Sequence, residues 1–458
     1  MNKQLIPPVI LALLGLMIIR SLLYCLVIPF DRSPDEAHYF KLIKAKQLQM
    51  SQASAEEIQR TTSRLAWQTY YLLYPHLAPE KRTIDDFADA ELPKPPSSLQ
   101  VYYLLNAELL RLLSLENIRD EIFVIRGFSM FCGVLTVWLA FLVTRELFPD
   151  SRFMLIGVPA FITFLPQFTA MSGVVDNDKL TGLCLGVMAW LLVRMMKQGL
   201  LTWYSVAYLV LMGVAILGKR TALFTIPLLL VIAMLSYRRE PLNIRVHLAV
   251  IGVFFVPIIG MFGLLEMPIE LKGLLKEYIV AIAPWQVRDF LLHEAYRPAQ
   301  LKYYAKFFTV FYWSFWGLFG YMTIHIHHFW YLLAAAWQGA AIAGLWKWGR
   351  QLKRKTAQLD AWKLKTLYLF GVSIVYVILI VFLRSVVFRP DNPMLSQGRR
   401  LFVVIIPVSV LTVLGLERLF PAKHHRWVGG LALVGLFIMD SVILSRYLLI
   451  NFHSLSLF

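Results

Sequence analysis

The first long apolar run of the chain stops at a polar stretch that reads Asp31-Arg32-Ser33-Pro34-Asp35-Glu36-Ala37-His38-Tyr39-Phe40. The apolar run covers residues 6–28, which is long enough for a helix that crosses a hydrocarbon core of about 30 Å. It is too long for the core of a signal peptide and lacks a small-residue cleavage site. The run therefore predicts a retained first membrane span, with the polar stretch at a membrane surface.

The composition of the whole chain indicates a membrane protein. Of its 458 residues, 58% are hydrophobic and only 16% are charged, which differs strongly from the composition of soluble globular proteins. Apolar runs of helical length recur from end to end, whereas a closed β-barrel would show short alternating segments. The sequence therefore predicts an all-α polytopic membrane protein. Cys25, Cys132 and Cys184 each lie inside an apolar run and are predicted to be inert packing residues.

Eleven membrane-spanning helices are predicted, at 6–28, 122–147, 153–172, 180–196, 201–217, 221–237, 246–265, 328–346, 364–384, 401–419 and 427–449. Helices outside the membrane are predicted at 35–50 and 54–74. The stretch 99–113 is interrupted by Asn106 and Glu108. We interpret it as a helix in the membrane interface, with a full span as the alternative.

The basic residues set the predicted orientation. The net charge is +17, but these residues collect in short loops between apolar runs, which favours membrane orientation and contact with lipid over binding of nucleic acid. If the N-terminus is cytoplasmic, so is the most basic loop, 347–365. The segments 29–121, 173–179, 266–327 and 385–400 then share the outer face, and Lys219-Arg220 is the exception to the charge rule. The chain 1–458 is predicted to be one membrane domain with two large outer loops, 29–121 and 266–327.

Asp35 and Glu36 are the strongest candidate catalytic residues. A carboxylate at a membrane surface can accept a proton from an attacking hydroxyl, and Glu36 and His38 can orient that carboxylate. The alternative is an ordinary helix N-terminus, with Ser33 as N-cap, Pro34 at the first helical position and the acids in the first turn. The alternative accounts for the local sequence equally well.

Two further polar blocks are predicted on the same outer face. The block 172–179 contains Asp176 and Asp178, which can bind a divalent ion or the hydroxyls of a sugar, or simply cap a tight turn. The block 389–400 ends in Gln397, Arg399 and Arg400, and its arginines can clamp a phosphate or contact lipid headgroups. A histidine cluster at 325–328 has no nearby carboxylate to complete a metal site. We interpret it as an interfacial stretch flanked by aromatic residues.

The order of these motifs resembles that of a known class of enzyme. Asp35-Glu36-x-His38 resembles the acidic motif in the first outer loop of the GT-C glycosyltransferases, polytopic enzymes that use polyprenyl-phosphate-linked sugars, and the protein O-mannosyltransferases carry a similar arrangement. The segment 172–178 resembles the second acidic motif of the oligosaccharyltransferase catalytic subunit.

The overall pattern is similar to that of a bacterial GT-C-like membrane protein family of unknown function. The corresponding positions are 34–38, Pro95-Pro96 with Tyr102-Tyr103, 176–178 and 397–400. Two positions depart from the family pattern, because Lys94 stands where His is usual and Arg400 replaces an aromatic residue.

The resemblance implies a GT-C-like bundle and an inverting glycosyltransferase on the outer face of a bacterial inner membrane. The donor would be a polyprenyl-phosphate-linked sugar and the acceptor a glycan, a lipid or a protein. Asp35 would be the general base, oriented by Glu36 and His38. The implied substrate-binding residues are Lys94, Tyr102, Asp176, Asp178, Lys219, Arg220, Gln397, Arg399 and Arg400.

Three alternatives remain open at the level of sequence. The scheme above requires no metal, but Asp35, Asp176 and Asp178 could instead hold Mg²⁺ or Mn²⁺. A transporter or flippase of lipid-linked sugars is a competing class, and it would place its working charges near the middle of the membrane on broken helices. The third alternative is a non-catalytic subunit of a larger assembly.

Overall fold

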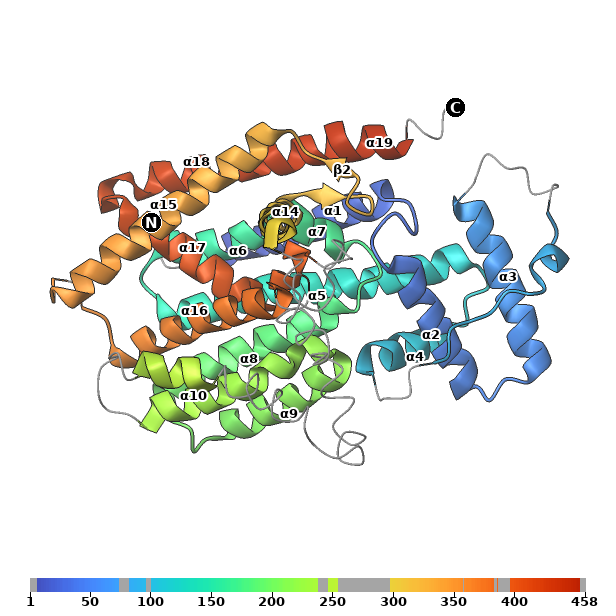
Figure 1. The fold of residues 1–458 in the computed structure, drawn as a ribbon, viewed down its shortest axis with the longest axis horizontal. Coiled ribbons are helices and arrows are strands. Elements are labelled where there is room, and N and C mark those ends of the chain that lie inside the picture. Colours follow the sequence, from blue (N-terminus) through green and yellow to red (C-terminus); the bar gives the residue numbers. More distant parts are fainter. Residues whose placement is uncertain are drawn as a thin grey trace.

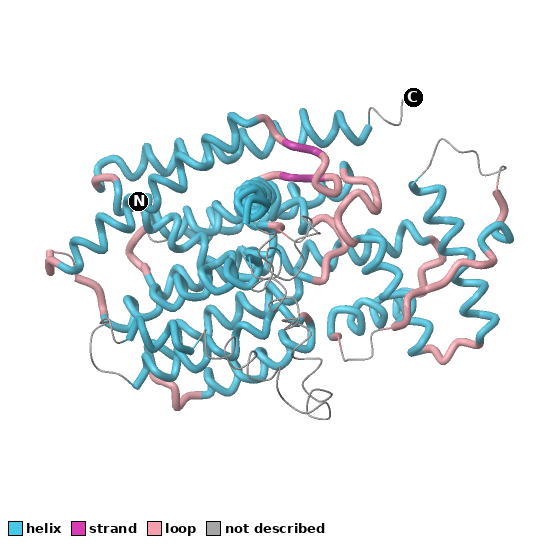
Figure 2. Tube along the Cα trace, viewed as in Figure 1, coloured by secondary structure: helices cyan, strands magenta, loops and turns pink. Residues whose placement is uncertain are grey.

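The computed structural model describes residues 6–73, 82–95, 100–237, 246–253, 297–356, 358–382, 385 and 396–453. These residues form a bundle of helices (Figure 1). Their one sheet is a short antiparallel pair, in which β1 (Leu318–Phe319) pairs with β2 (Ile324–His325) (Figure 2). The predicted all-α class is therefore confirmed for the described part of the chain. The three cysteines are buried and free, as predicted.

Six helical segments of the described chain are long and apolar enough to cross a membrane. They contain α1 (Ile6–Val27), α5 (Ile118–Leu147), α8 (Asp178–Gln198), α16 (Ala361–Phe382), the 3-10 helix η8 (Gly398–Val404) with α17 (Ile405–Leu419), and α18 (His425–Val442) with the π-helical η10 (Ile443–Leu449) and α19 (Ile450–His453). A seventh span is counted if α6 (Arg152–Thr163) and α7 (Pro166–Ser172) form one segment bent by 60°. Pro166 starts α7, where a proline is tolerated because its missing N–H has no helical partner.

The predicted number of eleven spans is not confirmed. The stretches 201–217 and 221–237 do form helices, α9 (Trp203–Gly218) and α10 (Thr225–Tyr237), but both are shorter than the other spans. The stretch 328–346 lies in the long helix α15 (His328–Lys353). This helix is not among the six candidate spans, because its His, Trp and Gln residues make it less apolar. The predicted span 246–265 lies largely outside the described residues.

The described part of the segment 29–121, the predicted first outer loop, contains a group of helices beside the bundle. It contains α2 (Glu36–Met50), α3 (Ala55–Leu73), the 3-10 helix η3 (Ile84–Phe87) and α4 (Val101–Leu113), which lie together at one end of the molecule in Figure 1. The helices predicted at 35–50 and 54–74 are confirmed. The helix α4 has 13 residues, fewer than the ~20 that a transmembrane helix needs. It packs against α2 through a hydrophobic cluster that includes Phe40, Ile43 and Tyr103.

Small residues and one buried ion pair hold the bundle together. The helices α15 and α17 approach closely because Gly344 and Gly415 face each other, and a Cβ on either glycine would collide with the opposite backbone. Arg20 of α1 pairs with Asp440 of α18, and the Tyr24 hydroxyl donates a 2.5 Å hydrogen bond to the same carboxylate. Because ions inside a bundle are costly unless paired, these contacts fix α18 against α1.

Candidate active site

The acidic turn between α1 and α2 has an unusual backbone. Asp31 and Asp35 both adopt left-handed conformations, with φ of 59° and 67°. The helix α2 starts at Glu36, and Asp35 makes no side-chain capping bond. The Ser33 hydroxyl lies 3.7 Å from the Met171 sulfur instead of capping the helix. The alternative interpretation, with Ser33 as N-cap and Pro34 as the first helical residue, is therefore wrong.

Glu36 is completely buried and is bound on both carboxylate oxygens. Arg126 of α5 donates from Nε to Oε1 at 2.9 Å and from Nη2 to Oε2 at 3.0 Å. The backbone N–H groups of Asp31 and Val175 each donate a further bond of 3.0 Å. The guanidinium also donates to the carbonyls of Cys25 and Ile28. Glu36 thus joins the end of α1, the start of α2, α5 and the second acidic motif.

The second acidic motif lies directly beside this pair, because Val175 is one of its donors. Asp176 is 3% exposed and accepts a 3.0 Å hydrogen bond from the backbone N–H of Asp178. Burial, together with the neighbouring Asp178 carboxylate, raises the pKa of Asp176. Arg399 and two lysines oppose this effect through their positive charge.

Lys219 links the second motif to the turn after α9. Its ammonium pairs with the Asp178 carboxylate and donates a 2.9 Å hydrogen bond to Asn177 Oδ1. The amide of Asn177 in turn donates to the Tyr103 hydroxyl at 3.1 Å. The lysine that seemed to violate the charge rule therefore has one acidic partner, Asp178, in the predicted cluster.

Arg399 completes the cluster from the start of η8. Its guanidinium lies 3.3 Å from Asp35 Oδ2 and also donates to Gln397 Oε1. The Arg399 side chain is 7% exposed, whereas the Asp35 side chain is 55% exposed. A Cβ at the neighbouring Gly398 would collide with the Phe311 carbonyl, so only glycine allows this approach to α14 (Arg297–Trp316). Asp35 is therefore an accessible carboxylate beside a buried cation.

Arg399 also lines a small pocket. Its lining combines two acids and two cations with aromatic and small residues, namely Thr136, Phe168, Asp176, Asp178, Lys179, Gly182, Arg399 and Phe402. The Lys179 ammonium donates to the Phe168 carbonyl at 3.1 Å and lies 3.9 Å from the centre of the Phe168 ring. The attraction between the ammonium and the face of the ring partly offsets the free energy that the cation loses when it leaves water.

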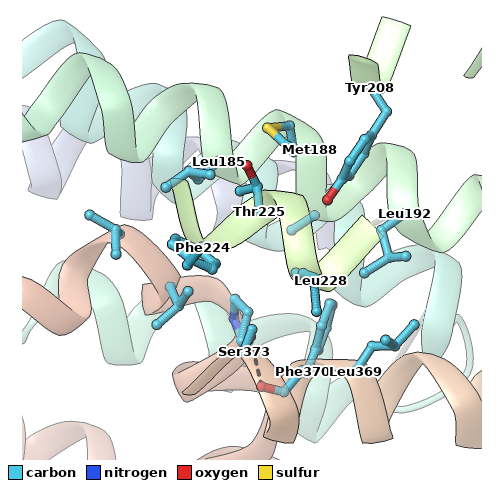
Figure 3. Close-up of a pocket in the computed structure, with 14 residues that line it drawn as sticks. Leu185, Met188, Leu192, Tyr208, Phe224, Thr225, Leu228, Leu369, Phe370 and Ser373 are labelled. Carbon is cyan, nitrogen blue, oxygen red and sulfur yellow. Dashed lines mark hydrogen bonds between the residues drawn. The ribbon is translucent and has the colours of Figure 1, made fainter. Parts of the chain in front are cut away.

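Two further pockets with mostly apolar linings lie between the helices. The first is lined by Asp178, Phe224, Val377, Ile380, Val381, Arg400 and Val403. The second shares Phe224 and Val403 with the first and extends between α8, α9, α10 and α16 (Figure 3). Figure 3 shows the Tyr208 hydroxyl directed into this second pocket, among leucine, methionine and phenylalanine side chains. An apolar route thus leads away from Asp178 and Arg400.

Several predicted site residues lie outside the cluster. His38 is exposed, with its ring beside that of Tyr39 and no hydrogen bond to Asp35 in the described chain. Lys94 is exposed on the loop before α4. Tyr102 is 1% exposed and packs against Tyr103 and Phe128. The Arg220 side chain and the stretch 389–392 lie outside the described residues.

Each of the three acids proposed as ligands of a divalent ion has a partner within the described chain. Asp178 faces Lys219, Asp35 faces Arg399, and Asp176 accepts a backbone N–H. No group of three or more His, Cys, Asp or Glu side chains suited to a metal ion occurs in the described part of the chain. His325 and His328 instead pack against the Trp313 ring, as expected for an aromatic interfacial stretch.

The comparison with protein families agrees with the chemistry of this cluster. Residues 109–261 match the family model described as dolichyl-phosphate-mannose-protein mannosyltransferase. The matched segment is about one third of the chain and includes Arg126, Asp176, Asp178 and Lys219. The resemblance to the GT-C glycosyltransferases is confirmed over this segment, and the match indicates a multi-pass membrane glycosyltransferase. A search of curated protein sequences finds no match to the chain.

Sequence reasoning missed four residues of this site. Three are described above, namely Tyr103, Arg126 and Lys179, and the fourth is Tyr321, whose hydroxyl donates a 2.7 Å hydrogen bond to Asp31 Oδ1. Arg126 is a single cation near the start of an apolar run, and that position is itself a signal because an intramembrane charge needs a partner. Tyr103 belongs to the tyrosine pair of the family pattern, and it, not Tyr102, contacts the second acidic motif. Lys179 directly follows the Asp-x-Asp block in the sequence, and this adjacency is the signal that could have identified it. Nothing in the sequence pattern singles out Tyr321.

Proposed function

We propose that this protein is an inverting glycosyltransferase that moves a sugar from a polyprenyl-phosphate carrier to an acceptor hydroxyl. The observation that carries the proposal is the contact between the exposed Asp35 carboxylate and the buried Arg399 guanidinium. A base and an anion-binding group then stand side by side, and Arg399 also lines a pocket together with Asp176 and Lys179. The match to a mannosyltransferase family supports the same chemistry.

The proposed reaction is a single in-line displacement. Asp35 accepts the proton of the acceptor hydroxyl, and the acceptor oxygen forms a bond to the anomeric carbon of the donor sugar. The bond between that carbon and the phosphate oxygen breaks, and its electron pair leaves with the polyprenyl phosphate. Arg399, with Lys219 and Arg400 nearby, stabilises the charge that develops on this phosphate. Glu36 holds the acidic turn in place and takes no proton in this scheme.

We assign the lipid chain of the donor to the two apolar pockets described above. Asp178 and Arg400 line one of them, so a phosphate held by the cluster would direct its lipid chain along Phe224 and Val403 toward the other. The lining residues are mostly aliphatic and aromatic, which suits an isoprenoid chain. We assign the polyprenyl tail to these pockets and the sugar to the space beside Asp35.

The proposal treats residues 1–458 as one catalytic unit in a bacterial inner membrane, with the cluster on the outer face. Asp176 and Asp178 are assigned to hydroxyl groups of the substrates and to the orientation of Lys219. His38, Lys94 and Tyr102 lie apart from the cluster, and we assign no step to them. Glycan, lipid and protein acceptors all supply the hydroxyl that the scheme needs.

The test is a transfer assay on purified protein in liposomes. The liposomes contain a panel of polyprenyl-phosphate-linked sugars and an extract of membrane glycans, and free polyprenyl phosphate is measured. We expect its release by the wild-type protein, loss of release in Arg399→Gln, and retention in Arg111→Gln, which removes an exposed arginine outside the cluster. Movement of the labelled lipid across the bilayer without sugar transfer would support a flippase instead. If no donor gives either sugar transfer or lipid movement, the proposal is overturned in favour of an assembly subunit.

A further inference from the structure

The tip of the β1–β2 hairpin has a strained backbone. Gly320, Tyr321 and Met322 are consecutive left-handed residues, with φ of 56°, 56° and 69°. Glycine adopts this conformation freely, whereas in other residues the Cβ atom makes it unfavourable. Such strain persists only where surrounding contacts hold it, and it is concentrated at functional sites.

The hairpin shares its left-handed backbone conformations with the acidic turn. Seven described residues other than glycine have positive φ, and four of them are Asp31 and Asp35 of the acidic turn and Tyr321 and Met322 of the hairpin. These two segments are almost 300 residues apart in sequence but are in direct contact. The strained backbone of the described chain therefore gathers around the candidate site.

Three contacts hold the hairpin against the site. The Tyr321 hydroxyl donates a 2.7 Å hydrogen bond to Asp31 Oδ1. The Met322 sulfur lies 3.4 Å from Gln397 Nε2, next to Arg399. At the base of the hairpin, the backbone N–H of Leu318 donates to Gln167 Oε1 of α7 at 2.9 Å. The tip thus touches both the acidic turn and the arginine segment.

Tyr321 reaches the candidate base through Asp31. The backbone N–H of Asp31 donates to Glu36, and Asp31 Oδ1 also accepts from the Ala37 N–H at 3.3 Å. The Tyr321 hydroxyl therefore binds a residue that is itself hydrogen-bonded to Glu36 and Ala37, the two residues that follow Asp35. Tyr321 is 38% exposed, so its ring stands on the solvent side of the acidic turn, where an acceptor must approach the accessible Asp35 carboxylate.

We propose that Tyr321 is a positioning residue for the acceptor. Its hydroxyl holds the acidic turn through Asp31, and its exposed ring forms a wall beside Asp35 against which the acceptor lies. The donor side of the site, with Arg399 and the apolar pockets, does not involve the Tyr321 hydroxyl. This inference rests on the proposed glycosyltransferase function and assigns the hairpin 318–325 to the acceptor side of that site.

The test separates acceptor binding from donor binding. Tyr321→Phe removes only the hydroxyl, and Tyr321→Ala removes the ring as well. We expect Tyr321→Phe to raise the KM for the acceptor by about tenfold, as for a lost hydrogen bond to a charged group. We expect Tyr321→Ala to raise it further, and the KM for the donor to stay within about twofold in both variants. The matched control is Tyr447→Phe, which removes a hydroxyl bonded to the backbone of His327, next to the hairpin.

The possible outcomes are distinct. If the wild-type protein transfers sugar but Tyr321→Phe and Tyr321→Ala keep the wild-type KM for the acceptor, the positioning role is wrong while the proposed function stands. Equal increases in both KM values would also overturn it, because they would indicate a general disturbance of the site. An absence of transfer by the wild-type protein would instead count against the proposed function itself. Thermal unfolding of each variant shows whether the fold is retained.

Discussion

Arg126 and Glu36 form a doubly hydrogen-bonded ion pair that is closed to solvent, with side chains 3% and 0% exposed. The two residues lie 90 positions apart, on α5 and at the first residue of α2. All the hydrogen bonds that Glu36 accepts come from groups that shape the site. The glutamate of the acidic motif therefore acts as an anchor, and Asp35 remains as the accessible carboxylate.

Removal of one partner of this pair should destabilise the protein strongly. Arg126→Met leaves the Glu36 carboxylate buried without its counter-ion, and we expect a loss of about 3–5 kcal/mol in the free energy of unfolding. The double variant Glu36→Gln with Arg126→Met should recover part of this loss, because no unpaired charge remains. Thermal unfolding in detergent measures both effects.

The control for this pair is the exposed ion pair between Arg111 and Glu108. Because solvent screens it, Arg111→Gln should leave the Tm unchanged. An Arg126→Met variant as stable as the wild-type protein would show that the buried pair does not anchor the acidic turn.

The raised pKa of Asp176 predicts a specific dependence of stability on pH. Burial and the Asp178 carboxylate disfavour the ionised form in the folded protein, so its pKa lies above the ordinary value of 3.8. The resulting penalty is absent below the pKa of the unfolded state, grows as the pH rises toward the folded-state pKa and is complete above it. Asp176→Asn keeps an oxygen for the Asp178 N–H and cannot ionise.

We therefore expect the Tm of Asp176→Asn, relative to that of the wild-type protein, to increase as the pH is raised from about 4 to about 8. Asp85→Asn changes an exposed carboxylate in the segment 29–121, away from Asp176 in the sequence, and should give a difference that does not vary with pH. A Tm difference for Asp176→Asn that is constant, or that increases toward low pH, would contradict the burial of an ionisable Asp176.

Much of the helical framework could be predicted from the sequence. Apolar runs and their lengths located α1, α5, α8, α16 and α17, because a span of the membrane needs a defined number of apolar residues. The charge rule correctly grouped the acidic turn, the Asp-x-Asp block and the 397–400 segment, which the structure brings together. The number of spans was predicted less well, since hydropathy alone does not distinguish a short or partly polar helix such as α9 or α15 from a full span.

One physical reason explains why sequence reasoning missed these residues. Their roles depend on side-chain partners far away in the chain, such as Tyr321 with Asp31 at a separation of 290 residues. No local periodicity or motif encodes such a pairing. The helix-cap interpretation of the acidic turn was wrong for a related reason, because contacts with Arg126 and Tyr321 hold Asp31 and Asp35 in conformations that local preferences disfavour.

The sidedness of the cluster can be tested by cysteine labelling, since the three native cysteines are buried. Single cysteines can replace His38 in α2 and Asp85 in η3, and also Lys353 at the end of α15 and Arg426 at the start of α18. In Figure 1, α2 lies at one end of the molecule, and α15 and α18 extend toward the other end. All four positions are exposed. We expect a membrane-impermeant reagent to label the first two from outside the cell and the last two only after permeabilisation. Labelling of all four from one side would contradict the predicted orientation.

The central claim is that Asp35 takes the proton of the acceptor, and the rate of a single round of sugar transfer tests it most directly. Asp35→Asn keeps the size of the side chain and removes its basicity. We expect it to slow transfer from a polyprenyl-phosphate-linked sugar by about 100-fold to 10,000-fold, the contribution typical of a general base. Binding of polyprenyl phosphate should persist, and Asp85→Asn should transfer at the wild-type rate. Transfer by Asp35→Asn at the full wild-type rate would contradict the account.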